Sequence, residues 1–303
     1  MRTHLLYKLK DIPADHDWLH SQPCPVIAYG TGTSVNADAI VPDRGAAETL
    51  IRRIDKNPLA ALVLVQTLRC TEQLETTLAL DVESMAYATL QAGKEFRHWQ
   101  SREQPAPPPA AMQGDAPILL SREGPLANAR LNRANTRNAM NIEMRDAWVE
   151  ALELLDLDDT IDTLRFSGNG ACFSTGGDLS EFGTFPDPAT AHHIRSALSP
   201  ARLLNRLGAR TCFYLHGACL GSGIELPAFS HRVIAHSRAF FQLPEIQLGL
   251  IPGAGGTVSI ARRIGRQRLG WMALSGKRIN AQQALELGLV DEIADQNPFI
   301  ATS

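Results

Sequence analysis

Apolar residues recur at helical spacing in the first hundred positions. Steps of three and four residues, which predict one buried helix face, separate Leu74, Leu78, Val82 and Met85. Asn57 and Pro58 predict the start of the preceding helix, because proline is tolerated in a first helical turn. Residues 26–28 (Val-Ile-Ala) favour a short strand. We therefore expect residues 1–104 to form a mainly helical segment.

A proline-rich stretch follows this segment. Residues 104–111 read Gln-Pro-Ala-Pro-Pro-Pro-Ala-Ala, which favours extended chain and cannot continue a helix. We predict a Pro/Ala-rich linker at residues 105–116 between the segment 1–104 and a larger unit at 117–303.

Strand and helix patterns alternate after the linker. Residues 118–120 and 126–131 predict two strands, and Asn141 is a good N-cap for the next helix. One face of that helix carries Met144, Trp148, Leu152 and Leu155. Short buried strands are expected at 163–166, 212–215 and 233–235, and further helices after Gly223, Gly255 and Asn280. This alternation predicts an α/β fold.

Composition excludes several classes of function. The 303 residues are 44% hydrophobic and 20% charged with a formal net charge of -3, so no surface for nucleic acid or anionic membrane is indicated. The five cysteines are scattered without a Cys-x-x-Cys pair, which predicts free thiols and neither a zinc site nor a disulfide framework. Without a signal-peptide or membrane-helix pattern, we expect a cytoplasmic protein.

Two glycine-rich junctions follow predicted strands. Residues 173–179 read Phe-Ser-Thr-Gly-Gly-Asp-Leu, and residues 216–225 read His-Gly-Ala-Cys-Leu-Gly-Ser-Gly-Ile-Glu. Glycine lets backbone N–H groups approach a ligand closely, and an N–H at a helix start can donate to an oxygen that becomes negative. One amide from each loop could thus form an oxyanion hole.

Two glutamates lie in apolar surroundings close to these junctions. Glu245 stands between Leu243 and Ile246, and Glu225 follows small and apolar residues. Burial raises the pKa of a carboxyl group, so both side chains could exchange protons near neutral pH.

Each feature also has a structural explanation. Glycine loops are often tight turns, and a glutamate at a helix start is often a solvated or capping residue. Ser222 lacks the Gly-x-Ser-x-Gly pattern of a nucleophile, and the pair at 192–193 (His-His) favours a surface position over a metal site. A solvated helix face is expected for Arg262, Arg263, Arg266 and Arg268.

The order of the motifs resembles one known family. From about residue 118 to 294 the chain is similar to the enoyl-CoA hydratase/isomerase (crotonase) superfamily. The matching motifs are 131–140 (Leu-Asn-Arg-Ala…Asn-Ala-Met), 173–179, 221–225, 243–245 with 251–256, and 281–293 (Ala…Ala-Leu…Gly-Leu-Val-Asp-Glu-Ile). The resemblance implies a crotonase-like ββα superhelix core.

The resemblance also implies roles for individual residues. The amides of Gly177 and Ser222 are expected to bind the thioester oxygen. Glu245 is expected to be the principal proton donor and acceptor, and Glu225 to position and polarise the attacking water. Substrate-binding roles are implied for Asp178, Leu179, Ser180, Arg137 and Gly253.

The chain departs from the family pattern in two places. Ser180 stands where many relatives carry lysine, which weakens an expected phosphate contact, and Arg137 is the proposed substitute for that charge. Family members usually continue past the 288–290 motif (Gly-Leu-Val) with helices that cover the active site. Residues 57–96 look similar to that helical tail, so we hypothesise that the N-terminal segment replaces it.

The leading function is therefore an enoyl-CoA hydratase that adds water across the 2,3 double bond of an enoyl thioester. The sequence also leaves open another crotonase-type reaction (isomerisation, dehydration or thioester hydrolysis) and a non-catalytic acyl-CoA-binding subunit. The resemblance implies no metal or redox cofactor, with coenzyme A as part of the substrate. A homo-trimer or hexamer is expected by analogy.

Overall fold

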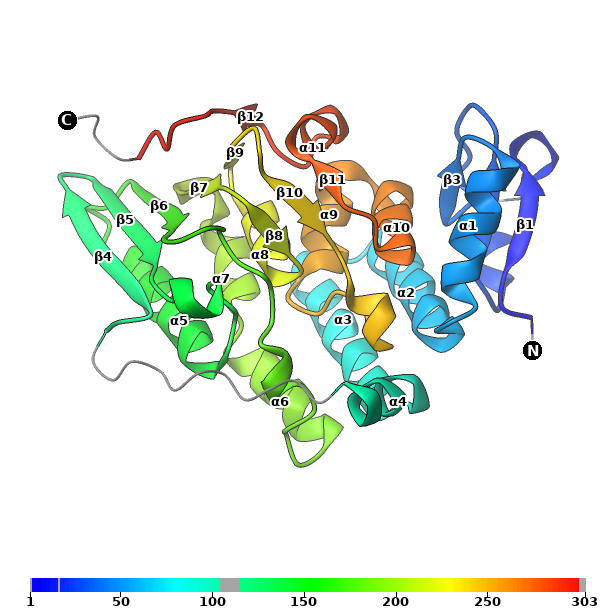
Figure 1. Cartoon of the computed structure of the whole chain (residues 1–303), viewed down its shortest axis with the longest axis horizontal. Coiled ribbons are helices and arrows are strands. Elements are labelled where there is room, and N and C mark those ends of the chain that lie inside the picture. Colours follow the sequence, from blue (N-terminus) through cyan, green and yellow to red (C-terminus); the bar gives the residue numbers. More distant parts are fainter. Residues whose placement is uncertain (1, 16, 104–114, 300–303) are drawn as a thin grey trace.

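The computed structural model describes residues 2–15, 17–103 and 115–299. These residues form three β-sheets with helices around them (Figure 1), so the α/β pattern is confirmed. Most of the linker expected at 105–116 falls on residues 104–114, which lie outside the described residues. The division into segments 1–104, 105–116 and 117–303 stays a prediction.

The largest sheet has six strands in the order β12-β9-β7-β6-β5-β4. Strands β4 and β5 pair antiparallel through a two-residue turn at Gly124, whose φ of 61° suits glycine, and the other pairings are parallel. The strands are β4 (Ile118–Glu123), β5 (Leu126–Leu131), β6 (Thr163–Gly168), β7 (Thr211–Leu215), β9 (Arg232–Ala235) and β12 (Glu292–Ile293). All the strands expected in this region are present.

Helix α5 (Ile142–Leu157) covers this sheet. Its N-cap is Asn141, whose side chain accepts a hydrogen bond from the Met144 amide, as the sequence predicts. The indole of Trp148 stacks on the rings of Phe166 and Phe213, with centroid separations of 4.5 and 5.8 Å. The predicted apolar face of α5 is therefore confirmed as its contact with the core.

A second sheet places the glycine loops. Its strands, in the order β11-β10-β8, are β8 (Ala218–Leu220), β10 (Phe240–Gln242) and β11 (Ile279–Asn280). Gly217 joins β7 to β8 with a φ of 59°, and a Cβ there would lie 2.2 Å from the carbonyl oxygen of Ala171. The chain can make this close turn because residue 217 has no side chain.

The remaining helices of the larger unit surround this sheet and the loops. The α-helices are α6 (Pro188–Ala197), α7 (Pro200–Leu207), α8 (Ser222–Glu225), α9 (Gly256–Ile264), α10 (Arg266–Ser275) and α11 (Ala281–Leu287). Short 3-10 helices of this unit lie at Ala134–Thr136, Leu179–Glu181, Gly208–Arg210, Pro227–Phe229 and Glu245–Leu248. Two more lie in the N-terminal segment, at Leu9–Asp11 and Leu19–Ser21. The helices predicted after Gly223, Gly255 and Asn280 are thus observed.

The N-terminal segment is mainly helical, as expected, but it also contains a small sheet. Strands β1 (Leu5–Lys8), β2 (Val26–Tyr29) and β3 (Ala39–Val41) pair in parallel, and only β2 was predicted. Helices α1 (Arg44–Ile54), α2 (Pro58–Thr71), α3 (Thr76–Gln91) and α4 (Lys94–Arg102) follow. The small sheet and α1 lie at one end of the molecule, and α2 and α3 lie beneath α9 and α10 (Figure 1).

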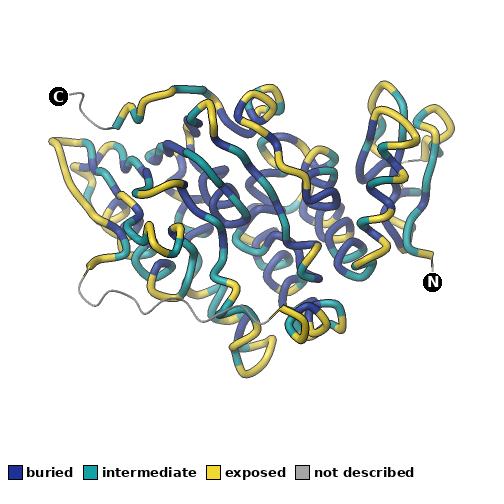
Figure 2. Tube along the Cα trace, in the orientation of Figure 1, coloured by how far each residue is buried: buried dark blue, intermediate teal, exposed yellow. Residues whose placement is uncertain are grey.

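The predicted buried face of α3 is wrong. Leu78 and Met85 are 56% and 50% exposed. The opposite face is buried instead, with small and polar residues among those that pack inward: Thr76, Ala79, Leu80, Glu83, Ser84, Tyr87, Ala88 and Leu90. The partners of this face come from α2, α6 and α9, which no local pattern within α3 reveals. Figure 2 shows the buried chain running through these helices in the centre of the molecule.

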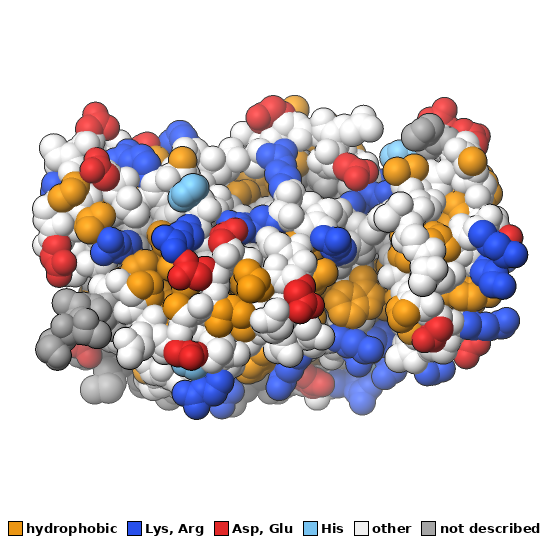
Figure 3. Space-filling model, turned by 90° about the horizontal axis from the view of Figure 1, so that it is seen from above, with side chains coloured by type: hydrophobic (Ala, Val, Ile, Leu, Met, Phe, Trp, Pro, Cys, Tyr) orange, Lys and Arg blue, Asp and Glu red, His pale blue; other side chains and the backbone are white. Residues whose placement is uncertain are grey.

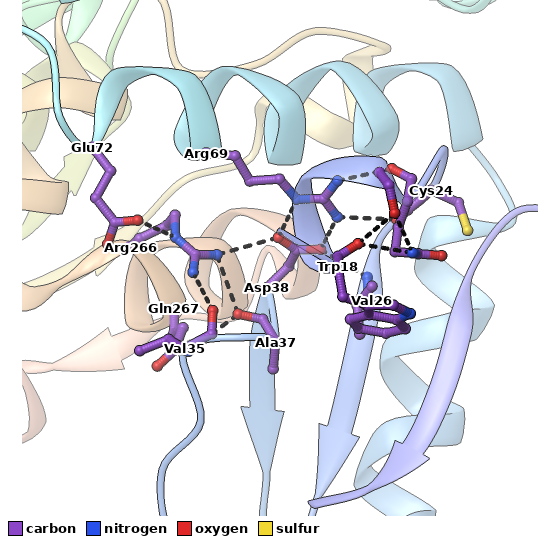
Figure 4. A network of polar contacts seen from close by, with 12 residues as sticks. Trp18, Cys24, Val26, Val35, Ala37, Asp38, Arg69, Glu72, Arg266 and Gln267 are labelled. Carbon is purple, nitrogen blue, oxygen red and sulfur yellow. Dashed lines mark hydrogen bonds and ion pairs between the residues drawn. The ribbon is translucent and has the colours of Figure 1, made fainter. Parts of the chain in front are cut away.

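The predicted solvated arginine face is also wrong in part. Arg262 and Arg268 are exposed, but Arg266 is buried and Arg263 is half-buried. Arg266 forms ion pairs with Asp38 and Glu72 and donates to the carbonyl oxygens of residues 35 and 37 (Figure 4). These partners lie more than 190 positions away in the sequence, so helical spacing alone did not reveal them.

The surface is mixed in charge. On the face drawn in Figure 3, Lys and Arg side chains are interspersed with Asp and Glu, in keeping with the small net charge. No helix in the described part of the chain is long and apolar enough to cross a bilayer.

Candidate active site

The two glycine loops predicted from the sequence pack against each other. A Cβ on Gly176 would lie 2.7 Å from the carbonyl oxygen of Leu220, and a Cβ on Gly223 would lie 2.6 Å from that of Ser174. Neither approach leaves room for a side chain. The glycines are therefore explained by close contact between the two loops, which fixes the positions of the amides that follow.

Two amides in these loops face the same cavity. Gly177 and Ser222 both line it, and neither backbone N–H donates to a protein acceptor within the described residues. The Ser222 hydroxyl is buried without a hydrogen-bond partner as well. Ser222 is buried and Gly177 is partly buried, and donors without a protein acceptor are available to an oxygen of a bound molecule.

Glu225 ends helix α8 and points toward the start of α9. It is 2% exposed, and its Oε2 accepts hydrogen bonds from the amides of Ala254 (2.8 Å) and Gly256 (2.9 Å). A Cβ on Gly256 would lie 2.5 Å from the Glu225 side chain. Two hydrogen bonds to Oε2 therefore fix the orientation of the Glu225 carboxyl.

Glu245 begins the 3-10 helix Glu245–Leu248 and lies beside Glu225. It is 8% exposed, and its Oε2 has no hydrogen-bond partner. A Cβ built on Gly221 would lie 2.6 Å from Glu245 Oε1 and 3.6 Å from Glu225 Oε1, so both carboxyls flank this glycine. The structure brings together two glutamates that are 20 positions apart, and leaves an oxygen of Glu245 free.

A third buried glutamate, Glu83, enters from helix α3. It is 2% exposed, its Oε1 accepts from the Gly255 amide (2.7 Å), and its Oε2 accepts from the amide (2.9 Å) and hydroxyl (2.6 Å) of Thr257. Glu83 and Glu225 therefore bind alternating amides of the same turn at the start of α9. The N-terminal segment takes part directly in building this site.

Burial raises the pKa of all three carboxyl groups. Desolvation is the main cause in each case, bringing the pKa of Glu83 to about 7 and that of Glu245 to about 8. The pKa of Glu225 is raised well above its usual value, first by burial and then by the charges of Glu245 and Glu83. Such groups can both hold and release protons near neutral pH.

The carboxyls and amides line a cavity of about 220 Å³. Its wall is largely apolar and includes Leu80 and Tyr87 of α3, Phe185, Leu198 and Leu226. Helix α3 of the N-terminal segment forms one side of this cavity, and the hypothesis that this segment replaces the family's helical tail stays a prediction. A site of this kind can exchange protons with a bound molecule and stabilise an oxyanion.

Six of the nine predicted site residues line this cavity, namely Gly177, Asp178, Ser222, Glu225, Glu245 and Gly253. The Asp178 carboxylate is engaged locally, accepting from the amide (3.0 Å) and hydroxyl (2.7 Å) of Ser180. Leu179, Ser180 and Arg137 do not line it, and Arg137 is exposed with a φ of 55°. The roles assigned to all nine stay predictions.

Sequence reasoning gave no role to several cavity residues, among them Glu83, Tyr87 and Arg195. The similarity of residues 57–96 to the family's helical tail included Glu83 and Tyr87, but it gave them no role. Arg195 gave no signal in the sequence. Among the described residues, no cluster of His, Cys, Asp or Glu is arranged to hold a metal ion, and the five cysteines are free thiols.

Comparisons with known proteins point to one family. The family model described as "Enoyl-CoA hydratase/isomerase" matches residues 121–302. The chain is 36% identical over 176 residues to a 2,3-dehydroadipyl-CoA hydratase of Escherichia coli (strain K12), covering 58% of this chain and 68% of the relative. It is 30% identical over 185 residues to a trans-2-decenoyl-[acyl-carrier-protein] isomerase of Streptococcus mutans, covering 59% and 69%.

Solved structures agree with the sequence comparison. The crystal structure of an enoyl-CoA hydratase from Thermoplasma volcanium GSS1 aligns with a TM-score of 0.54 at 31% identity, covering 60% of this chain and 73% of that one. An enoyl-CoA hydratase/isomerase from Mycobacterium paratuberculosis aligns with a TM-score of 0.55 at 28% identity, covering 60% and 74%.

Proposed function

The chain belongs to the enoyl-CoA hydratase/isomerase family, the crotonase superfamily, and from this premise we propose that it hydrates the 2,3 double bond of an enoyl thioester. The observation that carries the proposal is the pair of buried carboxyls, Glu225 and Glu245, which flank Gly221 in the cavity. Hydration needs one group that takes a proton from water and one that returns a proton to carbon. Two carboxyls with raised pKa values suit this exchange.

The two glutamates have different surroundings, which supports different roles. Glu225 is held through Oε2 by two amides, so it is suited to orient and polarise the attacking water. Glu245 keeps Oε2 free of protein donors and is suited to move the proton. The water oxygen bonds to the β-carbon, its proton passes to a carboxylate, and the α-carbon receives a proton as the enolate collapses.

The enolate oxygen needs stabilisation while it carries negative charge. We assign this role to the amides of Gly177 and Ser222, which have no other acceptor in the described protein. Loss of a single oxyanion-hole donor typically costs about 100- to 1,000-fold in kcat. The proposed reaction uses only carboxyls and amides of the chain, with coenzyme A as part of the substrate.

Isomerisation is the second candidate. It is favoured by the free Oε2 of Glu245, because one mobile carboxyl can take a proton from one carbon of the acyl chain and return it to another. Hydration makes better use of two carboxyls and stays the first proposal. Dehydration is the reverse of hydration and uses the same groups. Thioester hydrolysis and a non-catalytic acyl-CoA-binding role rank below these reactions, because no contact in the cavity favours either of them.

Loss of the conjugated-enoyl absorbance of crotonyl-CoA tests the proposal. We expect the parent protein to remove this absorbance rapidly. In Glu245→Gln and in Glu225→Gln, kcat should fall by at least about 100-fold, because a glutamine side chain cannot exchange the proton. Glu48→Gln is the matched control, because it makes the same change at an exposed carboxyl of α1, outside the cavity. A parent protein that leaves crotonyl-CoA and longer 2-enoyl-CoA thioesters unchanged would contradict hydration. Conversion of a 3-enoyl-CoA instead would favour isomerisation.

Assembly and location stay predictions. A homo-trimer or hexamer is proposed by analogy with the family, and its mass in solution can be measured by light scattering. The cytoplasmic location rests on the sequence patterns alone, and the sequence leaves the choice between a CoA and a carrier-protein thioester open.

A further inference from the structure

Three arginines line the cavity, and two of them are paired with carboxylates. Arg145 forms an ion pair with Asp146 (2.7 Å), and Arg202 forms one with Asp81. Arg195 forms no ion pair with any carboxylate in the described part of the chain. The cavity therefore contains a cation that no ion pair with a protein carboxylate neutralises.

The contacts of Arg195 are neutral and long. From α6 its Nε donates to Ser84 Oγ (3.3 Å), Nη1 donates to Gln91 Oε1 (3.2 Å), and Nη2 donates to the Ser84 carbonyl oxygen (3.4 Å). A guanidinium carries five N–H donors, so one N–H remains on each terminal nitrogen. That is the number that a bidentate contact with a carboxylate requires.

The electrostatic surroundings leave this charge largely uncompensated. Burial lowers the pKa of Arg195 from its usual value, and the carboxyl of Glu83 acts in the opposite direction. That carboxyl accepts hydrogen bonds from Gly255 and Thr257 instead of from Arg195, and burial raises its pKa to about 7. Keeping a guanidinium in a largely apolar cavity without a full counter-charge costs free energy, which an anionic ligand would offset.

Tyr87 links Arg195 to the proposed catalytic groups. The guanidinium lies over the Tyr87 ring, 4.7 Å from its centroid. The same ring packs on the backbone at Gly253, where an added Cβ would lie 2.2 Å from it, and the adjacent Ala254 amide binds Glu225. The Tyr87 ring therefore lies between Arg195 and the Gly253–Ala254 backbone, which binds the carboxyl of Glu225.

We propose that this cavity selects enoyl thioesters whose acyl chain ends in a second carboxylate, with Arg195 binding that carboxylate. The proposal rests on the proposed function, because the thioester end must lie at Gly177 and Ser222 for the far end of the chain to reach Arg195. The apolar wall, which includes Leu80 and Leu198, accommodates the methylene groups between the two ends.

Two other roles for Arg195 give different results. If it only fastens α6 to α3, its loss lowers stability and the activity toward every acyl chain alike. If it binds a phosphate of coenzyme A, its loss raises KM for every acyl-CoA and weakens inhibition by free coenzyme A. Only a role in specificity changes the ratio of kcat/KM for acyl chains with a terminal carboxylate to kcat/KM for uncharged acyl chains.

The experiment compares trans-2-hexenedioyl-CoA with trans-2-hexenoyl-CoA, which have the same length and differ in the terminal carboxylate. We expect the full-length parent to have a kcat/KM at least about tenfold higher for the diacid thioester. Arg195→Met is expected to lower kcat/KM for the diacid thioester by about 10- to 100-fold, because a charge-assisted bidentate contact is lost. The kcat/KM for the hexenoyl thioester should change little. Arg195→Lys should recover part of the preference, because it keeps the charge and loses the fork.

Arg145→Met is the matched control, since it removes a cavity arginine that is already paired with Asp146, and it should leave the ratio of the two kcat/KM values unchanged. A parent protein that prefers trans-2-hexenoyl-CoA would overturn the proposal. So would an Arg195→Met variant that lowers kcat/KM equally for the two thioesters. Calorimetric binding of the saturated thioesters adipoyl-CoA and hexanoyl-CoA provides a readout that does not depend on turnover. If neither enoyl thioester is hydrated but adipoyl-CoA binds more tightly through Arg195, the hydratase function fails and the selectivity stands.

Discussion

At the scale of single residues, three buried carboxyls lie together in the site. Glu83 and Glu225 accept hydrogen bonds from neighbouring amides at the start of α9, while Glu245 has an oxygen without a partner. After burial, which is the main cause, the charge of Glu83 also raises the pKa of both other glutamates. Glu83 thus acts on proton transfer through the two carboxyls that we assign to the reaction, as a positioning residue.

Glu83→Gln is expected to move the pH dependence of activity. The uncharged amide removes a like charge, so the pKa of the working carboxylate falls and the acid limb of kcat/KM shifts to lower pH. The variant also loses stability, by about 1–3 kcal/mol, because an amide cannot accept from all three donors. Profiles of kcat/KM between pH 5 and 9 on a 2-enoyl-CoA measure the shift.

Ala79→Gly serves as the control for that variant, because it disturbs a buried position of α3 outside the cavity and keeps the Glu83 charge. An acid limb that stays at the parent pH in Glu83→Gln, with lower activity alone, would mean that Glu83 has only a structural role.

At the scale of elements, the docking of α3 completes the cavity. The helix presents small and polar residues inward because it approaches α9 and the 251–255 loop closely, and Gly253 meets the Tyr87 ring without room for a methyl group. The exposed positions of Leu78 and Met85 follow from this requirement, because only the opposite face of α3 can bring Glu83 to the Gly255 and Thr257 amides.

Gly253→Ala is expected to displace α3. The added Cβ would lie 2.2 Å from the Tyr87 ring, and overpacking of this kind typically costs about 1–3 kcal/mol. We expect a lower unfolding temperature and a kcat/KM at least about tenfold lower. The double variant Gly253→Ala/Tyr87→Ala should lose less stability than the sum of the single variants, because removing the ring relieves the clash. Strict additivity would show that the ring is not the cause.

At the scale of the whole molecule, a buried ionic network joins the N-terminal sheet to the larger unit. Asp38, just before β3, accepts from the amide of Val26, from Arg69 of α2 and from Arg266 of α10 (Figure 4). Asp38 and both arginines are buried. The carboxylate of Asp38 therefore holds together strand β2, helix α2 and helix α10.

Asp38→Asn is expected to destabilise the protein by about 3–5 kcal/mol, because it leaves the buried guanidinium of Arg69 without its counter-charge and that of Arg266 with Glu72 alone. Urea unfolding measures the change. Arg44→Ala breaks the exposed Arg44–Glu48 pair on α1 and should change stability by no more than about 0.5 kcal/mol. A loss below about 1 kcal/mol in Asp38→Asn would contradict a stabilising role for the network.

The sequence alone indicated the strands at 118–120, 126–131, 163–166, 212–215 and 233–235 and the helix that follows Asn141, because local signals such as the Asn141 cap act over a few residues. It also indicated Glu225, Glu245 and the glycine loops, since ordered motifs carry that information. Only the tertiary structure decided which face of α3 is buried, that Glu83 and Arg195 enter the cavity, and that Arg266 is paired inside the protein. Burial, and the partner a charge finds, depend on segments far away in the sequence, and hydrophobic periodicity within one helix does not specify them.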